Sequence, residues 1–351
     1  MSGDSYWYSR AADDLIELDF KIHKYIFHNK QVVPNFFYIF PVCLVAISKL
    51  LFGTEWQNAF MIFNLILVFF SLVLFSKSLL LLNIKPVLIS LTVLLIPLSS
   101  DLLTWPRYIL TDMIFSFLVT TLVYTVVKSI AKGKSYYFIL ILIITLMFLT
   151  RPTSIPFIFS IIFFILISKI KIIYNPKSIL LIFFLLIILM PFVSTLLYHL
   201  METYLITNSK ALILINMVKD GMIIHDRPET WVRSPNTFLE IFNLYFKRLI
   251  FFFTPFVKNF SMVHNIINLF QALIILFSLS IWFFLGDKHN AINKAIFFIL
   301  LISISTAVFH SFTLIDYDFR YRFPIIMPLM IIFPISLTIF LKKLNKLKNR
   351  I

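Results

Sequence analysis

Residues 57–80 read QNAFMIFNLILVFFSLVLFSKSLL, an apolar run whose one charged residue, Lys77, lies near its end. The hydrocarbon core of a bilayer is about 30 Å thick, and a helix of about 20 apolar residues crosses it. The run is long enough for one crossing. It therefore predicts a transmembrane helix.

Similar apolar runs, bounded by charged residues or by Pro, recur along the chain. They lie near residues 87–104, 112–130, 136–150, 156–173, 178–199, 264–285, 295–315 and 324–341. Together with 57–80 they make about nine spans. We expect an all-α protein, a polytopic bundle of transmembrane helices that forms one domain over residues 1–351.

The composition excludes the other broad classes of protein. Hydrophobic residues make up 60% of the 351 residues and charged residues 13%, whereas a soluble domain has about 45–50% and about 25%. The net charge of +15 does not indicate a nucleic-acid partner, because Lys and Arg fall mostly in short loops between apolar runs. The single cysteine, Cys43, excludes an internal disulfide and any multi-cysteine metal site.

The charges predict the orientation in the membrane, because short cytoplasmic loops are enriched in Lys and Arg. The basic connections hold Lys77 and Lys85, Lys128 to Lys134, Lys169 to Lys177, and Lys288 with Lys294, and the tail 342–351 is basic as well. Every acidic residue except Asp287 falls on the opposite side. We expect a multi-pass protein of the plasma (inner) membrane whose working face is periplasmic or extracellular.

The polar content of that outer face is concentrated in two long segments, residues 1–56 and 200–263. Six spans lie between them in residues 57–199, and three more follow in 264–341. The first segment predicts a helix lying along the interface, because apolar residues recur in it at helical spacing: Leu15, Leu18, Ile22, Tyr25 and Ile26. The second segment contains Arg227 and a loop-like stretch at 225–236.

Residues 36–52 leave two topologies open, because the run is barely long enough to cross and is interrupted by Lys49 and Gly53. If the run does not cross, the amino terminus is outside and the carboxyl terminus is cytoplasmic. If it crosses, both termini are cytoplasmic. An outer start without an export signal leads us to expect a further apolar helix upstream of Met1.

Several short motifs follow one another along the outer edge of the bundle. They are Gly3-Asp4-Ser5-x-x-Tyr8, the segment Pro34 to Gly53, Arg107-Tyr108-Ile109-Leu110-Thr111-Asp112, Leu149-Thr150-Arg151-Pro152-Thr153, and Arg320-Tyr321-Arg322-Phe323-Pro324 with Pro328. Their order resembles that of the GT-C superfamily of integral-membrane glycosyltransferases, in particular its protein-mannosyltransferase-like and lipid A sugar transferase-like branches. Those enzymes place a transmembrane helix before the first outer loop, whereas here the loop begins at residue 1.

The resemblance implies transfer of a sugar from a polyprenyl-phosphate donor to a hydroxyl of a lipid, glycan or protein acceptor, with inversion at the anomeric carbon. Asp4 would be the general base, and Asp112 would orient the acceptor or hold a cation. No cofactor is certain. A divalent cation stays an open alternative, since the outer carboxylates could serve as ligands or as a base.

The outer arginines are the candidates for binding the donor phosphate, because a guanidinium matches phosphate oxygens bidentately. We expect Arg151 to do so with help from Arg320 or Arg322. Tyr8 and Arg107 complete the predicted substrate-binding set. The partners expected are the lipid-linked donor, its acceptor and membrane lipid, with no nucleic acid.

Each of these residues also has a structural interpretation. Asp112 could be a helix amino-terminal residue, and Arg107 and Arg151 could be interfacial arginines at span ends. Arg320 and Arg322 could pair with Asp316 and Asp318. His199 and His310 have no partner at metal-ligand spacing, so we interpret both as buried hydrogen-bonding residues.

The alternative function is a transporter or flippase of lipid-linked saccharides, or an O-antigen polymerase. Either would share the apolar bundle and the outer arginines. A transporter should show ionisable groups at mid-membrane depth and internal repeat symmetry. Neither is clear in the sequence, so the enzyme is favoured.

Overall fold

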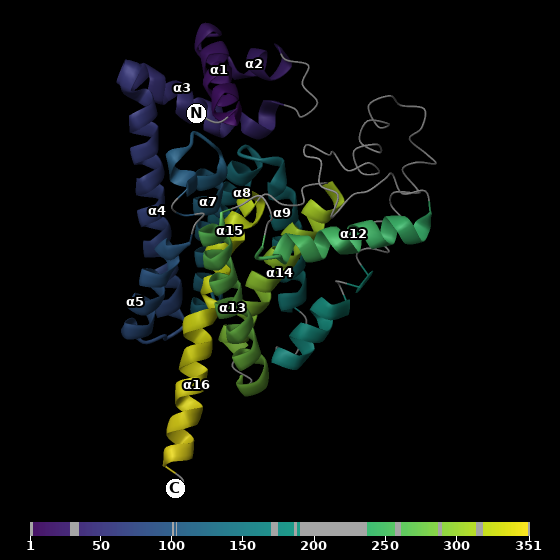
Figure 1. The fold of residues 1–351 in the computed structure, drawn as a ribbon. Coiled ribbons are helices and arrows are strands. Elements are labelled where there is room, and N and C mark those ends of the chain that lie inside the picture. The colour runs from purple at the N-terminus through teal and green to yellow at the C-terminus, as the bar shows by residue number, and fades with distance from the viewer. Residues whose placement is uncertain are drawn as a thin grey trace.

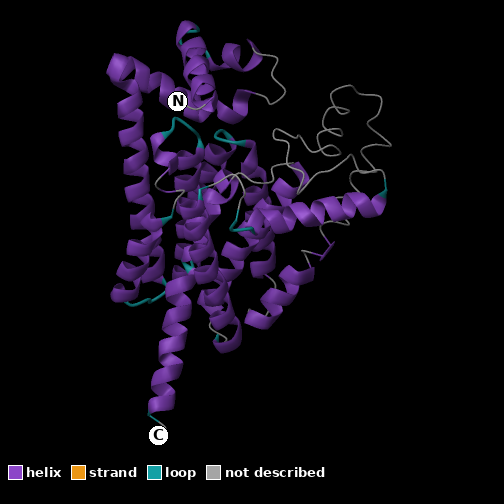
Figure 2. Cartoon of the chain, in the orientation of Figure 1, coloured by secondary structure: helices purple, strands orange, loops and turns teal. Residues whose placement is uncertain are grey.

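The computed structural model of the chain describes residues 3–28, 35–99, 102, 104–169, 175–185, 188–189, 237–256, 261–286, 290–313 and 319–349. Helices are the only regular secondary structure in these ranges (Figure 2). The predicted all-α fold is therefore confirmed for them. The predictions about Arg227, His199 and the stretch 225–236 lie outside the described residues, as does the predicted pairing of Arg320 and Arg322 with Asp316 and Asp318.

Three amino-terminal helices lie together at one end of the molecule (Figure 1). They are α1 (Gly3–Glu17), α2 (Ile22–His28) and α3 (Ile39–Phe52). Helix α1 turns one face inward, because Tyr8, Ala11, Ala12 and Leu15 are buried at helical spacing. We call these three helices the cap.

Lys49 joins α1 to α3. Its ammonium group donates to the Asp13 carboxylate at 2.7 Å and to the Ser9 carbonyl at 2.9 Å, and it lies 4.9 Å from the centre of the Trp56 ring. Lys49 therefore binds α1 at the junction of α3 with the next helix. The interruption that Lys49 makes in the apolar run 36–52 thus has a structural role.

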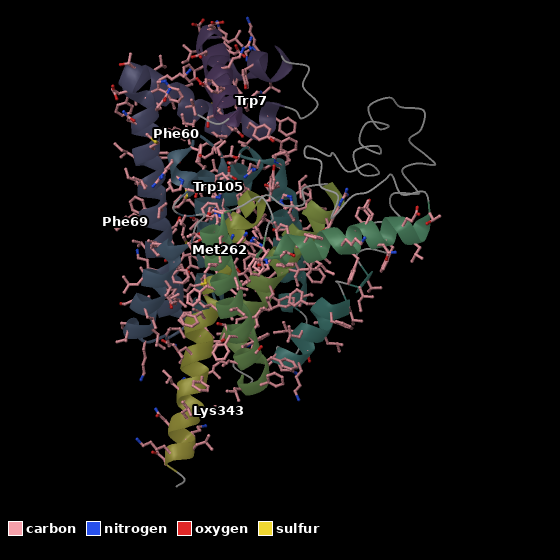
Figure 3. The ribbon with its side chains drawn as sticks, viewed as in Figure 1. Trp7, Phe60, Phe69, Trp105, Met262 and Lys343 are labelled. Carbon is pink, nitrogen blue, oxygen red and sulfur yellow. The ribbon has the colours of Figure 1, made fainter. Side chains whose placement is uncertain are left out.

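The longest helix, α4 (Trp56–Leu81), descends from the cap and packs against α7 (Asp112–Lys132). Its buried face includes Phe60, Asn64 and Phe75, while Phe69 points away from the bundle (Figure 3). In α7 most residues of the first turns are buried, so this helix lies in the centre of the bundle. Both helices agree with the predicted spans 57–80 and 112–130.

The remaining described helices complete the bundle. They are α5 (Pro86–Leu95), α8 (Tyr137–Phe148), α9 (Ile155–Lys169), a helix at Pro176–Leu185, α12 (Phe238–Phe253), α13 (Met262–Leu285), α14 (Asn290–Thr313), α15 (Phe319–Met330) and α16 (Ile332–Lys348). Helices α14 and α15 pack against α7, α9 packs against α14, and α13 packs against α16. Helix α12 crosses the direction of the bundle and packs on α14 (Figure 1).

Length and composition identify five candidate membrane spans within the described ranges: Phe36–Leu81, Asp112–Lys132, Met262–Leu285, Ala291–Ser311 and Tyr321–Lys348. The predicted count of about nine is therefore not confirmed. Several predicted spans are shorter as helices. The run 87–104, for example, leaves α-helical geometry after Leu95, where Pro97 lies in a 3-10 turn.

The cap and the carboxyl terminus lie at opposite ends of the molecule (Figure 1). Helix α3 lies with α1 and α2 at the cap end, whereas the basic end of α16, marked by Lys343, extends from the other end (Figure 3). This arrangement favours the topology in which residues 36–52 do not add a crossing.

Candidate functional site

A buried ion pair lies where α7 begins. One oxygen of the Asp112 carboxylate accepts a hydrogen bond from Nη1 of Arg151 at 2.5 Å. The two side chains are 0% and 6% exposed. Asp112 is the first residue of α7, where the helix dipole favours a negative charge. The structure thus brings together two predicted site residues that are far apart in the sequence.

The local sequence explains how Arg151 reaches this position. Helix α8 ends at Phe148, and the Arg151 amide still bonds to the Met147 carbonyl at 3.1 Å. Arg151 itself is extended, with φ −160° and ψ 146°, as a residue before proline prefers. Pro152 then opens a short 3-10 turn, η5 (Pro152–Ser154), which leads into α9. The Arg-Pro dipeptide therefore ends one helix and starts the next.

One aromatic ring contacts the ion pair, and further ring contacts lead away from it. The Arg151 guanidinium lies 5.5 Å from the centre of the Tyr321 ring in α15. The Tyr321 ring is 4.8 Å from the ring of His310 in α14, which stacks on Phe252 of α12 with ring centres 5.7 Å apart. Neither Tyr321 nor Phe252 was predicted to belong to the site. The signal available for Tyr321 was its place between Arg320 and Arg322.

Two predicted site residues, Arg320 and Arg322, lie in α15. The Nη1 group of Arg322 donates to the carbonyls of Phe252 at 3.1 Å and Thr254 at 2.7 Å. Arg322 thereby binds the carboxyl-terminal end of α12, where backbone carbonyls have no partner within the helix. Arg320 lies in the first turn of α15, and its side chain is outside the described part of the structure.

Arg107 is exposed at the end of a 3-10 turn, η4 (Trp105–Arg107). Asn64 of α4 binds the end of this turn, because its amide nitrogen donates to the Pro106 carbonyl at 3.2 Å and to the Tyr108 carbonyl at 3.1 Å. The Asn64 side chain is buried among apolar residues of the bundle. It therefore fixes the backbone that leads into Asp112.

The predicted residues of the cap are only partly described. Asp4 lies in α1, but its side chain is not described, so its distance from Asp112 is not tested. Tyr8 is 5% exposed and makes edge contacts with Trp7 and Tyr38, with ring centres 4.8 and 6.1 Å apart. These contacts give Tyr8 a packing role within the cap.

Buried hydroxyl groups flank the ion pair in the sequence. Thr111 Oγ1 and Ser154 Oγ have no hydrogen-bond partner among the described residues. Thr111 precedes Asp112, and the Ser154 amide donates to the Arg151 carbonyl at 3.1 Å. The start of α7 and the η5 turn thus carry polar groups able to bind a ligand or water.

The described ranges contain no group of three or more His, Cys, Asp and Glu residues that could hold a metal ion. Asp112, the buried carboxylate of the site, is paired with Arg151. Because the Asp4 side chain is outside the description, a cation between Asp4 and Asp112 stays an untested prediction.

Comparison with known proteins supports a membrane glycosyltransferase. Residues 39–195 match the sequence model of the family described as dolichyl-phosphate-mannose-protein mannosyltransferase, a family of the GT-C superfamily. The matched range includes α4, α7 and the Asp112–Arg151 pair. It confirms the resemblance predicted from the motifs. No curated protein and no solved structure matches the chain.

Proposed function

We propose that this glycosyltransferase-like membrane protein moves a sugar from a polyprenyl-phosphate donor to a hydroxyl of a lipid, glycan or protein acceptor. The observation that carries the proposal is the buried Asp112–Arg151 pair at the start of α7, inside the range that matches the mannosyltransferase family. Such a pair is costly to bury in an apolar bundle, and buried ionisable groups in membranes mark functional sites.

The position of Arg151 suits a lipid-anchored phosphate. The polyprenyl tail would lie among the apolar helices, and the phosphate would meet a guanidinium that keeps its charge in a low-dielectric environment. A guanidinium has five N–H donors and can bind a carboxylate and a phosphate together. Asp112 would then hold the Arg151 side chain in orientation while the donor is bound.

The proposed reaction is a direct displacement at the anomeric carbon. The acceptor oxygen forms a bond to this carbon, the bond to the phosphate oxygen breaks, and polyprenyl phosphate leaves as an anion. A carboxylate accepts the proton of the acceptor hydroxyl, and we assign this role to Asp4. Attack from the face opposite the leaving group inverts the anomeric configuration.

The orientation of the site is also part of the proposal. We infer that the cap end faces the periplasm or exterior and that the basic end of α16 is cytoplasmic, in agreement with the enrichment of Lys and Arg in cytoplasmic loops. The exposed side chain of Arg107 supports its assignment to this face. Arg107, Arg320, Arg322 and Tyr8 are the further proposed substrate-binding residues.

The function can be tested with the purified protein in lipid vesicles. A panel of polyprenyl-phosphate sugars, radiolabelled in the sugar, is supplied together with membrane extract as the source of acceptor. We expect free polyprenyl phosphate to be released as labelled sugar enters an acceptor. Movement of intact donor across the membrane without cleavage would instead identify a flippase, and elongation of a lipid-linked saccharide would identify a polymerase.

A further inference from the structure

His310 contacts the rings of Phe252 and Tyr321, and the proposed reaction gives it no role. It lies in α14 near the carboxyl-terminal end of that helix and is 1% exposed. Its Nδ1 atom is buried and has no hydrogen-bond partner in the part of the chain that the structure describes. Buried polar atoms almost always have a partner, and the exceptions concentrate where a protein binds ligands or water.

The surroundings of the imidazole ring are aromatic. Phe252 stacks nearly parallel to it with an interplanar angle of 12°, and Tyr321 contacts it at 45°. Phe309, the preceding residue, meets it edge-on. Packing alone would be satisfied at this position by a phenylalanine, which has no nitrogen to desolvate. The buried Nδ1 atom of His310 therefore indicates a role besides packing.

Tyr321 connects His310 to the ion pair. The same tyrosine ring contacts the imidazole and lies 5.5 Å from the Arg151 guanidinium. His310 and Arg151 thus both contact the ring of Tyr321, from two different elements. A donor whose phosphate binds Arg151 would place its sugar near Tyr321 and His310.

We propose that His310 binds the sugar of the donor, with Nδ1 forming a hydrogen bond to a sugar hydroxyl. This inference rests on the proposed function, because it takes the phosphate of a glycosylated polyprenyl phosphate to lie on Arg151. It separates two subsites: Arg151 binds the phosphate that every polyprenyl-phosphate ligand carries, and His310 binds only ligands that carry a sugar.

Binding measurements on the purified full-length protein test this separation. The ligands are polyprenyl phosphate and the same lipid carrying the sugar transferred by the wild type. His310→Phe keeps an aromatic ring between Phe252 and Tyr321 but removes Nδ1. We expect it to weaken binding of the glycosylated lipid by about tenfold, the effect of losing one well-placed hydrogen bond, and to leave binding of polyprenyl phosphate unchanged.

Two further variants make the result independent of packing. His310→Asn places an amide where Nδ1 lies, whereas His310→Gln places it near the position of Nε2, so Asn should retain more of the sugar-dependent affinity. Ser303→Ala, in the same helix, is the control, because the Ser303 hydroxyl donates to the Ile299 carbonyl of its own helix and, among the residues that the structure describes, to no other group. If His310→Phe does not fold, the comparison of Asn with Gln decides.

The outcomes are distinct. Equal affinity of wild type and His310→Phe for the glycosylated lipid, equal loss of both ligands, or equal behaviour of the Asn and Gln variants would each overturn the role of His310 while leaving the proposed function standing. Failure of the wild type to bind either lipid would overturn the proposed function, and the sugar subsite with it.

Discussion

The guanidinium of Arg151 lies 5.5 Å from the centre of the Tyr321 ring, although the two residues come from opposite halves of the chain. Arg151 belongs to the motif Leu149–Thr153, and Tyr321 to the motif Arg320–Pro324. Contact of a cation with an aromatic face is favourable, and more so away from water. The two motifs are far apart in the sequence, and the fold brings them into contact at one site.

Separating the ion pair should cost more stability than removing it. We expect Arg151→Met to lower the free energy of unfolding by about 3–5 kcal/mol, because Asp112 would be left as a buried charge without its cation. The double variant Arg151→Met with Asp112→Leu should regain much of this loss, since it removes both charges. Thermal unfolding in detergent measures both. Equal stability of single and double variants would mean that an unpaired Asp112 carboxylate carries no cost at this position.

Charge alone should not replace the guanidinium of Arg151. Arg151→Lys keeps the positive charge but loses the planar fork that binds carboxylate and phosphate together, so donor binding should fall by at least about tenfold. The affinity for polyprenyl phosphate, measured on the folded variant, gives the answer. Lys49→Arg in the cap is a matched control outside the proposed site. Wild-type affinity in Arg151→Lys would limit Arg151 to the role of a structural partner of Asp112.

Asn64 should act as a positioning residue for the turn before α7. Asn64→Leu removes the donor to two carbonyls and should destabilise the protein by about 1–3 kcal/mol, with a local change near Trp105. The matched control is Ser71→Ala in the same helix, because within the described part of the chain the Ser71 hydroxyl bonds only to the Leu67 carbonyl one turn earlier. Thermal unfolding and tryptophan fluorescence would report the difference. Identical results for both variants would remove Asn64 from this role.

The positions of the apolar helices could be predicted from the sequence, but not which of them are long enough to cross the membrane. The predictions 57–80 and 112–130 agree with α4 and α7 because both runs are about as long as one membrane crossing or longer and have charged residues at or near an end. The run 324–341 lies within the candidate span Tyr321–Lys348, but this span is divided between α15 and α16, where the sequence contains Pro324, Pro328 and Pro334. A hydropathy pattern does not show where proline divides a helix.

The individual residues of the site were easier to predict than their partners. Asp112 and Arg151 stand out as charges at the ends of apolar runs, yet nothing in the sequence indicates that they bind each other. Tyr321 and His310 were not predicted to lie in one cluster. In a chain with 42 Phe and 14 Tyr residues, the sequence does not distinguish an aromatic side chain of the site from one that only packs. Only the packing of α14 and α15 brings them together.

The topology predicts which positions a membrane-impermeant thiol reagent can reach. In a background of Cys43→Ser, we expect labelling from the outside of Asp4→Cys and Arg227→Cys, and protection of Lys132→Cys and Lys343→Cys. One reason is that basic and acidic residues fall in loops on opposite sides of the bundle. The other is that the cap and the carboxyl-terminal end of α16 lie at opposite ends of the molecule (Figure 1). Protection of position 4 together with position 132 would mean that residues 36–52 cross the membrane.

The general base should be Asp4. Base catalysis by a positioned carboxylate contributes about 10²–10⁴ in rate, and Asp4→Asn removes the base while it keeps the shape of the side chain. The variant should bind donor like the wild type but turn over at least about a hundredfold more slowly, because only the proton transfer from the acceptor hydroxyl is lost. Single-turnover transfer and donor binding, measured on the same folded preparation, separate the two effects. Asp13→Asn is the control within the cap, because this carboxylate bonds to Lys49. Wild-type turnover by Asp4→Asn would place the base elsewhere, and Asp112, buried beside Arg151, would be the next carboxylate to test.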